Sequence, residues 1–394
     1  MDEKRETWLQ QYQNVLELYK EEPKWVRQLR EKSFRSYIEQ PTPNFGPDVN
    51  LSINRIFPIV GDCENQDQSF LQDEKKVVYC DLRTAWDQYS KLVRPCLQHV
   101  IRCDENKYSA LHTALMNGGT FIYVPPHTKV EVPFTSLFQK SDTEISSFPH
   151  TLIIVDEGSE LTYVEDSKGT SKRESFMISE VEIYVKKKAK CHYISFSNDT
   201  SLDHLSIKRS IVEEDGYLEW IQCDMGDHVK MGYPSYILKG NGASAKMWQC
   251  TLISSRQEKD IGAKMIHLGE NTKSSITSQA IVMKDAFLTE RNTINITKKA
   301  KNSKSDVKCD TIIIDECSKN DKIPKNTISN RSSHINYEAH VSKNCPSWIE
   351  EILEKETDEE KMKLCLLSGA MSRMLPEKQK KLWMKIWNKY KGEL

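Results

Sequence analysis

Two short segments near the end of the chain carry thiol, imidazole and carboxylate side chains at the spacing of a β-strand. Alternation along the first segment puts Cys309 on one face of a strand together with apolar neighbours. Along the second segment, residues 334–341, the same alternation puts His334, Glu338 and His340 on a shared face. Alternate residues of a strand lie about 6–7 Å apart, so these three are candidates for neighbouring ligand positions, although not all for one ion.

These side-chain types indicate metal chemistry. Thiolate combined with imidazole and carboxylate suits iron or copper better than calcium or magnesium, and iron–sulfur clusters require thiolate in particular. The competing interpretation is a core cysteine beside a solvated polar strand face. Spacing alone leaves both interpretations open.

The remaining cysteines and the absent motifs narrow the chemistry further. The chain has 11 cysteines at irregular spacing and no Cys-x-x-Cys pair, which matches neither a zinc site nor a disulfide framework. In a reducing cytosol we expect most of them to be small buried hydrophobes. No P-loop, Rossmann fingerprint, HExxH or GxSxG motif occurs, so we expect a chain that binds no nucleotide and is not an enzyme.

The composition argues against nucleic-acid-binding, secreted and membrane-spanning proteins. Lysines and arginines number 56 against 57 acids, so bulk charge implies no nucleic-acid partner. The first residues are charged and lack the apolar stretch of a signal peptide, and the longest apolar runs are strand-sized, far below the membrane-spanning length of about 20 residues. We therefore expect a soluble, cytoplasmic protein of 394 residues.

The periodicity of apolar residues changes twice along the chain. Residues 5–40 and 81–118 have helical spacing, with a proline-rich linker or strap at 40–47. From Thr120 to about residue 345 the pattern alternates as in half-buried strands. A charged turn containing Gly or Ala, followed by an alternating strand, recurs there every 25 to 31 residues or so, at 157–163, 188–193, 215–220, 240–247 and 269–276.

Such repeating units can bury their apolar faces only by stacking on one another. We therefore predict a mostly β protein with a β-helix, or solenoid, core over residues 119–345. A helical region with an extended strap precedes it over residues 1–118, and a second helical region follows over residues 346–394. The last region has more apolar positions than so short a bundle needs, which indicates a surface for a partner.

Seven segments of the chain match segments of one known family: 22–25, 43–48, 119–126, 130–133, 151–158, 233–240 and 264–275. Over about residues 20–390 the chain resembles the SufB/SufD family of iron–sulfur cluster assembly scaffold proteins. It looks like a divergent paralogue nearer to SufB than to SufD. The resemblance implies a right-handed parallel β-helix flanked by N- and C-terminal helices.

The resemblance also implies partners. Members of this family dimerise through the β-helix, either SufB with SufD or like with like. Their C-terminal helices dock the ABC-type ATPase SufC, which here implies that residues 346–394 bind a SufC-like ATPase. A cysteine-desulfurase system supplies sulfur and so acts with the complex indirectly. The implied cofactor is a transient iron–sulfur cluster.

The family's cluster site falls on particular residues of this chain. Cys309 and Glu338 match the family's cysteine and glutamate, which are 29 residues apart in both. The family's histidine just before that glutamate is Tyr337 here, and the acid before it is Asn336. A tyrosine cannot replace imidazole as a ligand at neutral pH without losing its proton.

The family's sulfur-entry residues depart further from the pattern. The second family cysteine, which receives sulfur, matches Ser167, which cannot carry a persulfide. The other residues of that path match Gln139, Ser141, Ser197 and Asp199.

Three hypotheses remain, and each assigns the chain to a different class of protein. The chain is a cluster scaffold with Cys309 and Glu338 as ligands and His334 or His340 as helpers. Alternatively it is a purely structural, SufD-like partner that holds no cluster. In the third hypothesis it is a β-helical binding protein or carbohydrate enzyme outside the pathway; such an enzyme needs clustered carboxylates on a strand face, whereas the acids here appear mostly at turns, as at Asp156 and Glu157.

Overall fold

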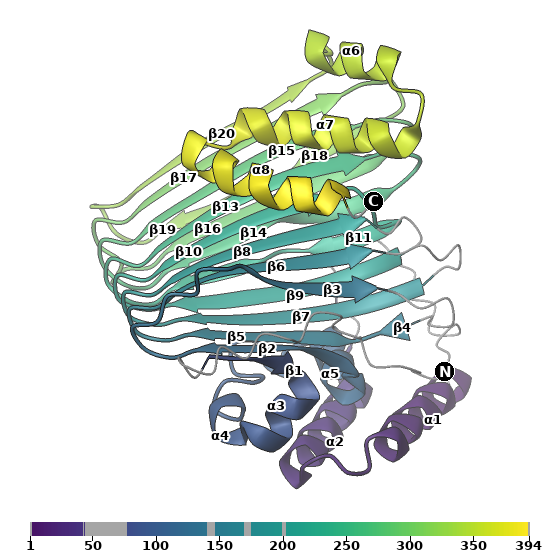
Figure 1. The fold of residues 1–394 in the computed structure, drawn as a ribbon, viewed down its shortest axis with the longest axis vertical. Coiled ribbons are helices and arrows are strands. Elements are labelled where there is room, and N and C mark those ends of the chain that lie inside the picture. The colour runs from purple at the N-terminus through teal and green to yellow at the C-terminus, as the bar shows by residue number, and fades with distance from the viewer. Residues whose placement is uncertain are drawn as a thin grey trace.

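The computed structural model describes residues 2–41, 43, 77–139, 146–168, 175–198 and 202–392. Most of the predicted strap after residue 40 lies outside these ranges, as do Cys63, Ser141 and Asp199. Within them, the chain winds back and forth between two stacked sheets and forms a β-solenoid of about seven turns with helices at both ends (Figure 1). The predicted fold class is confirmed.

Successive strands of the solenoid alternate between the two sheets. Sheet A has 12 strands and sheet B has 8. All pairs in both sheets are parallel, apart from one antiparallel pair at the start of sheet A. The strands of sheet A are β1 (Val78–Asp81), β2 (Gly118–Val124), β4 (Ser146–Ser147), β5 (Pro149–Val155), β7 (Ser175–Val185), β9 (Leu202–Val212), β11 (Val229–Gly232), β12 (Ser235–Leu238), β14 (Glu258–His267), β16 (Phe287–Ile296), β18 (Lys319–Lys322) and β19 (Lys325–Ile328). The strands of sheet B are β3 (Phe134–Gln139), β6 (Glu160–Lys168), β8 (Lys190–Asn198), β10 (Tyr217–Asp224), β13 (Ser244–Ile253), β15 (Lys273–Val282), β17 (Lys304–Ile313) and β20 (His334–Ser342).

The charged turns predicted from the repeat connect sheet A to sheet B and stack on one another. Each turn has one residue with positive φ, and backbone hydrogen bonds of 2.8–2.9 Å link consecutive turns, as from Lys188 N to Glu214 O and from Asp215 N to Asn241 O. Gly, Asn and Asp adopt this conformation at the lowest cost, and five of the seven positions carry one of them. The positive-φ residues are His127, Gly158, Lys188, Asp215, Gly242, Asn271 and Asn302.

The space between the two sheets is apolar near these turns and polar farther along the strands. The apolar layer contains Tyr163, Tyr193, Trp220, Tyr236 and Met265, all fully buried. Beyond it, inward positions of the same strands carry serine, glutamine and charged side chains. A solenoid core that changes from apolar to polar along its strands can hold chemistry that a wholly apolar core cannot.

The N-terminal helices cover the outer face of the first strands of sheet A (Figure 1). The predicted helical stretch at 81–118 is divided into three short helices, and strand β1 precedes it. Asn106 begins the last of these by accepting hydrogen bonds from the backbone N–H groups of Tyr108 and Ser109. The helices are α1 (Asp2–Leu18), α2 (Lys24–Glu39), α3 (Leu82–Gln88), α4 (Ser90–Val93) and α5 (Lys107–Leu115).

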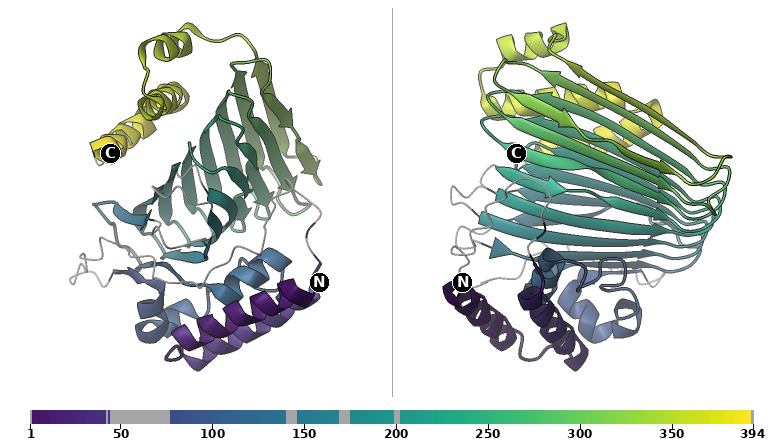
Figure 2. Two further views of the ribbon diagram at one scale, coloured as in Figure 1. Left: turned by 90° about the vertical axis from the view of Figure 1, so that its right-hand side faces the viewer. Right: turned by 180° about the vertical axis from the view of Figure 1, so that it is seen from behind.

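The C-terminal helices lie on one side of the solenoid, against the outer face of sheet B (Figure 2). Trp383 is fully buried there and stacks on Trp387 with ring centroids 5.0 Å apart, beside Phe196 of β8. Among the described helices, none combines the length and the apolar composition that crossing a membrane requires. The three helices are α6 (Ser347–Lys355), α7 (Glu359–Met374) and α8 (Glu377–Gly392).

One glycine shows how tightly adjacent coils approach. A Cβ atom added to Gly262 of β14 would lie 2.0 Å from the carbonyl oxygen of Arg291 on β16, and Gly262 has a φ of +155°. Because the obstacle is the backbone of a paired strand, it cannot move aside cheaply. We expect Gly262→Ala to lower the free energy of unfolding by about 1–3 kcal/mol or more, measured by urea denaturation; an unchanged midpoint would contradict this packing.

Candidate functional site

Cys309 lies inside the solenoid, on the face of β17 that points toward sheet A. Its side chain is 0% exposed, and the side-chain amide of Asn292 on β16 donates a hydrogen bond to Sγ at 3.1 Å. The Asn292 amide is itself held in place, because its Oδ1 accepts the backbone N–H of Ala263 at 2.9 Å. The thiol therefore faces a fixed donor, which is an arrangement that stabilises sulfur carrying negative charge.

A buried ion pair lies next to this thiol. Glu290 accepts hydrogen bonds from Ser278 at 2.8 Å and from Thr311 at 2.9 Å, and it pairs with the ammonium group of Lys322. Asn292, Glu290, Ser278 and Thr311 are each at most 4% exposed. The Lys322 side chain is 10% exposed. The group thus combines a thiol, N–H and O–H donors, a carboxylate and an ammonium in one dry space.

Burial keeps the resting thiol protonated. Desolvation raises the pKa of Cys309 to about 11, and the nearby Glu290 adds to the rise. Hydrogen bonds from Ser278 and Tyr337 and the charge of Lys322 act in the opposite direction. Binding of a metal ion would have to displace the thiol proton, and the donors around Sγ would then support the thiolate.

The other predicted ligands lie on the opposite face of the same sheet. In the register of β17 with β20, Glu338 is opposite Lys308, whereas Cys309 is opposite Ala339. Glu338, His334 and His340 are exposed on the outer face, where Asn336 donates a hydrogen bond to Glu338 at 3.3 Å. Within one chain the structure therefore does not bring Glu338 or the two histidines to Cys309.

Tyr337 occupies the inward position of β20 instead. It is partly buried, packs against the interior and interacts through its hydroxyl with the Cys309 thiol. Burial raises the pKa of Tyr337 to about 12, and the neighbouring Cys309 adds to the rise. Tyr337 therefore acts as a hydrogen-bond donor near Sγ. Because β20 is the last strand of sheet B, this part of the site lies at the edge of the sheet.

Cys309 belongs to a line of polar side chains that runs through the interior along sheet B. The registers of six successive strands align these side chains, which we call the interior polar row. Cys191, by contrast, is aligned with Leu161 and Leu218 in the apolar layer. The interior polar row consists of Glu165, Ser195, Gln222, Gln249, Ser278 and Cys309.

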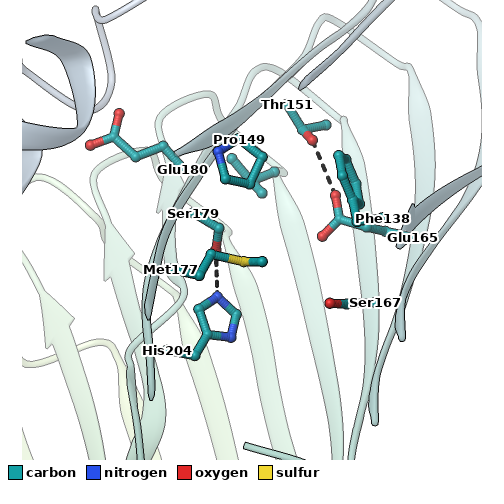
Figure 3. Close-up of a pocket in the computed structure, with 10 residues that line it drawn as sticks. Phe138, Pro149, Thr151, Glu165, Ser167, Met177, Ser179, Glu180 and His204 are labelled. Carbon is teal, nitrogen blue, oxygen red and sulfur yellow. Dashed lines mark hydrogen bonds between the residues drawn. The ribbon is translucent and has the colours of Figure 1, made fainter. Parts of the chain in front are cut away.

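Ser167 lies at the other end of this interior, two residues beyond Glu165 on β6. Both residues line a pocket between the sheets, opposite Ser179 and His204 (Figure 3). Glu165 also accepts a hydrogen bond from Tyr193 at 2.6 Å. Ser167, which the sequence resemblance predicts to stand at a sulfur-receiving position, is thus inside the solenoid and carries a hydroxyl.

Ser179, His204 and Asp227 lie in line and are buried, with a hydrogen bond between the first two and an ion-pair contact between the last two. Ser179 Oγ lies 2.7 Å from His204 Nε2, and His204 Nδ1 lies 3.5 Å from Asp227 Oδ1. Desolvation lowers the pKa of His204. The order of groups matches that of a hydrolase triad, but His204 Nδ1 and Asp227 Oδ1 make no hydrogen bond, and Ser179 lies within a paired strand, opposite Ser206, and not on an exposed turn. We interpret the three as structural.

The middle coils enclose four charged side chains, which we call the interior charge cluster: Asp224, Asp227, Lys230 and Lys259. Lys230 bonds to Asp227 at 2.9 Å and also to Asp224. The ammonium group of Lys259 makes no hydrogen bond with the described residues, although it is fully buried. One lysine of the cluster is therefore paired and the other is not.

Lys259 should make stability depend on pH. Desolvation lowers its pKa from 10.5 to about 8, so between these values the unfolded chain binds more protons than the folded chain. The free energy of unfolding contributed by this group therefore rises with pH across that window. We expect Lys259→Met to raise the free energy of unfolding by about 1–3 kcal/mol at pH 7.

The advantage of Lys259→Met should shrink as pH rises from about 8 to 10.5, because the wild-type lysine loses its charge there. Urea denaturation of both proteins at several pH values measures the difference. A difference that is constant with pH would contradict this assignment.

Sequence reasoning missed most of this interior. The sequence predicts acids mostly at turns, yet Glu165, Asp224 and Glu290 lie on strands and point inward. The sequence does contain a signal for these acids, because each lies on the same face of its strand as residues that are buried. What the sequence could not supply was the register that aligns these positions across neighbouring coils.

Comparisons with known proteins give a consistent result. Residues 137–344 match the family model described as SUF system FeS cluster assembly, SufBD core domain, and residues 2–135 match the SufBD protein N-terminal region. The chain is 33% identical over 369 residues to the iron-sulfur cluster assembly protein SufB of Bacillus subtilis, covering 82% of this chain and 79% of that protein. It is 30% identical, at the same coverage, to SufBD family proteins of Staphylococcus saprophyticus and Staphylococcus epidermidis.

Proposed function

Because the chain belongs to the SufBD family of iron–sulfur cluster assembly proteins, we propose that it is a scaffold subunit on which iron and sulfide are assembled at Cys309. The cluster is cargo, held until it is passed on. The observation that carries the proposal is the hydrogen bond from Asn292 to the buried sulfur of Cys309. A neutral thiol packed in an apolar core needs no hydrogen-bond donor at its sulfur, whereas a thiolate is stabilised by one.

Cys191 provides the comparison within the same sheet. It is as deeply buried as Cys309, but it lies among leucines in the apolar layer, and desolvation alone raises its pKa to about 12. Cys309 instead has hydrogen-bond donors and the Lys322 ammonium beside it, which lower the cost of forming a thiolate. This difference supports a chemical role for Cys309 and a packing role for Cys191.

The outer face of β20 is the second part of the proposed site. Glu338, His334 and His340 lie on the last strand of sheet B, whose outer edge is free to meet another subunit. We propose that a SufB- or SufD-like paralogue, or a second copy of this chain, binds along this strand. In such a dimer the outward carboxylate and imidazoles become ligands contributed at the subunit contact, separate from the Cys309 interior.

The C-terminal helices are the proposed contact for a SufC-like ABC ATPase. α7 and α8 bury one side against sheet B, while Met384 of α8 is 39% exposed. This chain has no P-loop, so the ATPase would supply nucleotide binding and hydrolysis. A cysteine-desulfurase system would supply sulfur. The ten described cysteines are all free, which suits the reducing conditions of the cytoplasm.

A purely structural, SufD-like role is the alternative, and Ser167 favours it. A hydroxyl at this position cannot take sulfur as a persulfide, so sulfur delivered by the desulfurase would have to reach Cys309 by another route. In this alternative the chain supplies one half of a dimer and one ATPase contact, and its partner holds the cluster.

Anaerobic reconstitution distinguishes the two roles. The purified full chain is incubated with ferrous iron and sulfide, alone and together with the ATPase subunit, and then passed through a gel-filtration column. A scaffold is expected to retain iron, sulfide and the visible absorption of a cluster. A protein that elutes folded but colourless under both conditions would support the structural role and overturn the scaffold proposal.

A further inference from the structure

Two histidines and a glutamate meet beneath the N-terminal helices, on the side of sheet A that faces away from Cys309. His112 comes from α5, His150 from β5 and Glu180 from β7, and all three side chains are fully buried. The Nδ1 atoms of His112 and His150 lie 3.1 Å and 3.5 Å from Glu180 Oε2. One nitrogen or oxygen atom from each of the three residues lies within 4.8 Å of the other two.

These separations suit the first shell of a metal ion. Ligand atoms bound at about 2.1 Å in tetrahedral geometry are about 3.4 Å apart. Two imidazoles and one carboxylate are also a ligand set that divalent zinc and ferrous iron accept. Glu180 also lines the pocket beside Ser167, but Figure 3 shows its carboxylate pointing away from Ser167 and His204.

The outer nitrogens of the two imidazoles face acceptors. His112 Nε2 donates to the carbonyl oxygen of Pro149 at 3.0 Å, which places the proton of this ring on Nε2 and leaves a lone pair on Nδ1. His150 Nε2 lies 3.2 Å from Glu182 Oε2, at ion-pair distance, but makes no hydrogen bond with the described residues. Carbonyl and carboxylate groups in these positions are the partners that orient histidine ligands of metals.

Glu182 is fully satisfied without a metal. Its carboxylate accepts backbone N–H groups of the 98–101 turn at 2.6–3.1 Å. Glu180 is not: Gln98 Nε2 donates to its Oε2 at 2.6 Å, while its buried Oε1 has no hydrogen-bond partner among the described residues. A cation bound beside Oε2 and the two Nδ1 atoms could also be held by Oε1, which would give this free oxygen a partner.

We propose that His112, His150 and Glu180 bind one divalent transition-metal ion of the zinc or ferrous class. The ion ties α5 to β5 and β7 and so holds the N-terminal helices on the first coils of the solenoid. The site is structural, because its ligands are buried and none of them contacts the Cys309 interior. It is distinct from any cluster carried by the chain.

Protons are the competitors of the metal at this site. Desolvation opposes protonation of His150, but hydrogen bonds to Glu180 and Glu182 outweigh it and raise its pKa to about 9. A protonated imidazole would also occupy the space beside Glu180. The experiment must therefore separate a metal-bound group from a proton-bound one.

The test uses the full chain, stripped with a chelator and then titrated with zinc or cobalt(II). We expect one equivalent to remain after dialysis and the melting temperature to rise by several degrees, because the ion binds only the folded chain. The cobalt(II) form should show ligand-field bands without sulfur charge transfer, since the ligands are nitrogen and oxygen. Glu180→Gln and His112→Asn should each lose the equivalent and the thermal shift, whereas the exposed His228→Gln should keep both.

X-ray absorption of the zinc-loaded wild-type chain makes the test independent of whether the variants fold. Two imidazoles and oxygen in the first shell, with no sulfur, are the expected result. Zinc bound through sulfur would overturn the proposal, as would a wild-type chain that takes up no ion and shows no thermal shift, since protons alone would then hold the group together.

Discussion

Replacing Cys309 with alanine is expected to remove about nine-tenths of the cluster that the wild-type chain retains after anaerobic reconstitution. Iron–sulfur clusters are held by thiolates, and Cys309 is the cysteine that ends the interior polar row beside Asn292. Its removal leaves no sulfur ligand among these donors. Iron and acid-labile sulfide per chain, with the visible absorption spectrum, measure the loss.

Cys191→Ala is the matched control for that experiment. Cys191 is equally buried on the inward face of sheet B, so both variants delete one thiol from the solenoid interior and both create a small cavity. The Cys191 variant should keep its cluster and lose only stability, by about 1–2 kcal/mol. Equal cluster loss in both variants would mean that packing, and not ligation, explains the effect.

Replacing Lys230 with methionine is expected to have the largest effect on stability. Lys230 pairs with both aspartates of the interior charge cluster, and desolvation of the lysine is outweighed by these contacts, which raise its pKa. Removing one partner of a buried ion pair leaves the other charge uncompensated and costs about 3–5 kcal/mol. That is a large share of the typical 5–15 kcal/mol or so of a folded domain.

The same substitution at Lys259 is the control, and it should change stability in the opposite direction. Lys259 lies in the same cluster but makes no hydrogen bond with the described residues. Urea denaturation at pH 7 compares the two variants with the wild-type chain. If Lys230→Met and Lys259→Met lower the free energy of unfolding equally, the division into a paired and an unpaired lysine is wrong.

The fold could be predicted because its repeat is local. The turns at Lys188, Asp215 and Asn271 need residues that tolerate positive φ, and the strands after them alternate between buried and exposed positions. Both features lie within about ten consecutive residues. Stacking then follows, because a single coil cannot bury its apolar face.

The site could be predicted only in part, because it depends on register. Alternation assigned Cys309 to one face of its strand and Glu338 to one face of another, but each strand has two faces. Only the pairing of Lys308 with Glu338 shows that the thiol and the carboxylate point in opposite directions. The inward side chain next to Cys309 is Tyr337.

The group formed by His112, His150 and Glu180 had no local signal. These residues are 30 or more positions apart in the sequence, and one comes from a helix while two come from strands. Each alone is more readily explained as a buried polar residue that has found a partner. Their convergence follows from the packing of α5 on sheet A, which periodicity does not encode.

The most direct test of the scaffold function is a crystal structure of the anaerobically reconstituted full chain, with anomalous data collected at the iron absorption edge. We predict an iron peak inside the solenoid, within bonding distance of Cys309 Sγ and close to Asn292 and Tyr337. Crystals of coloured protein with iron only on the outer face of β20, beside Glu338 and His340, would contradict it.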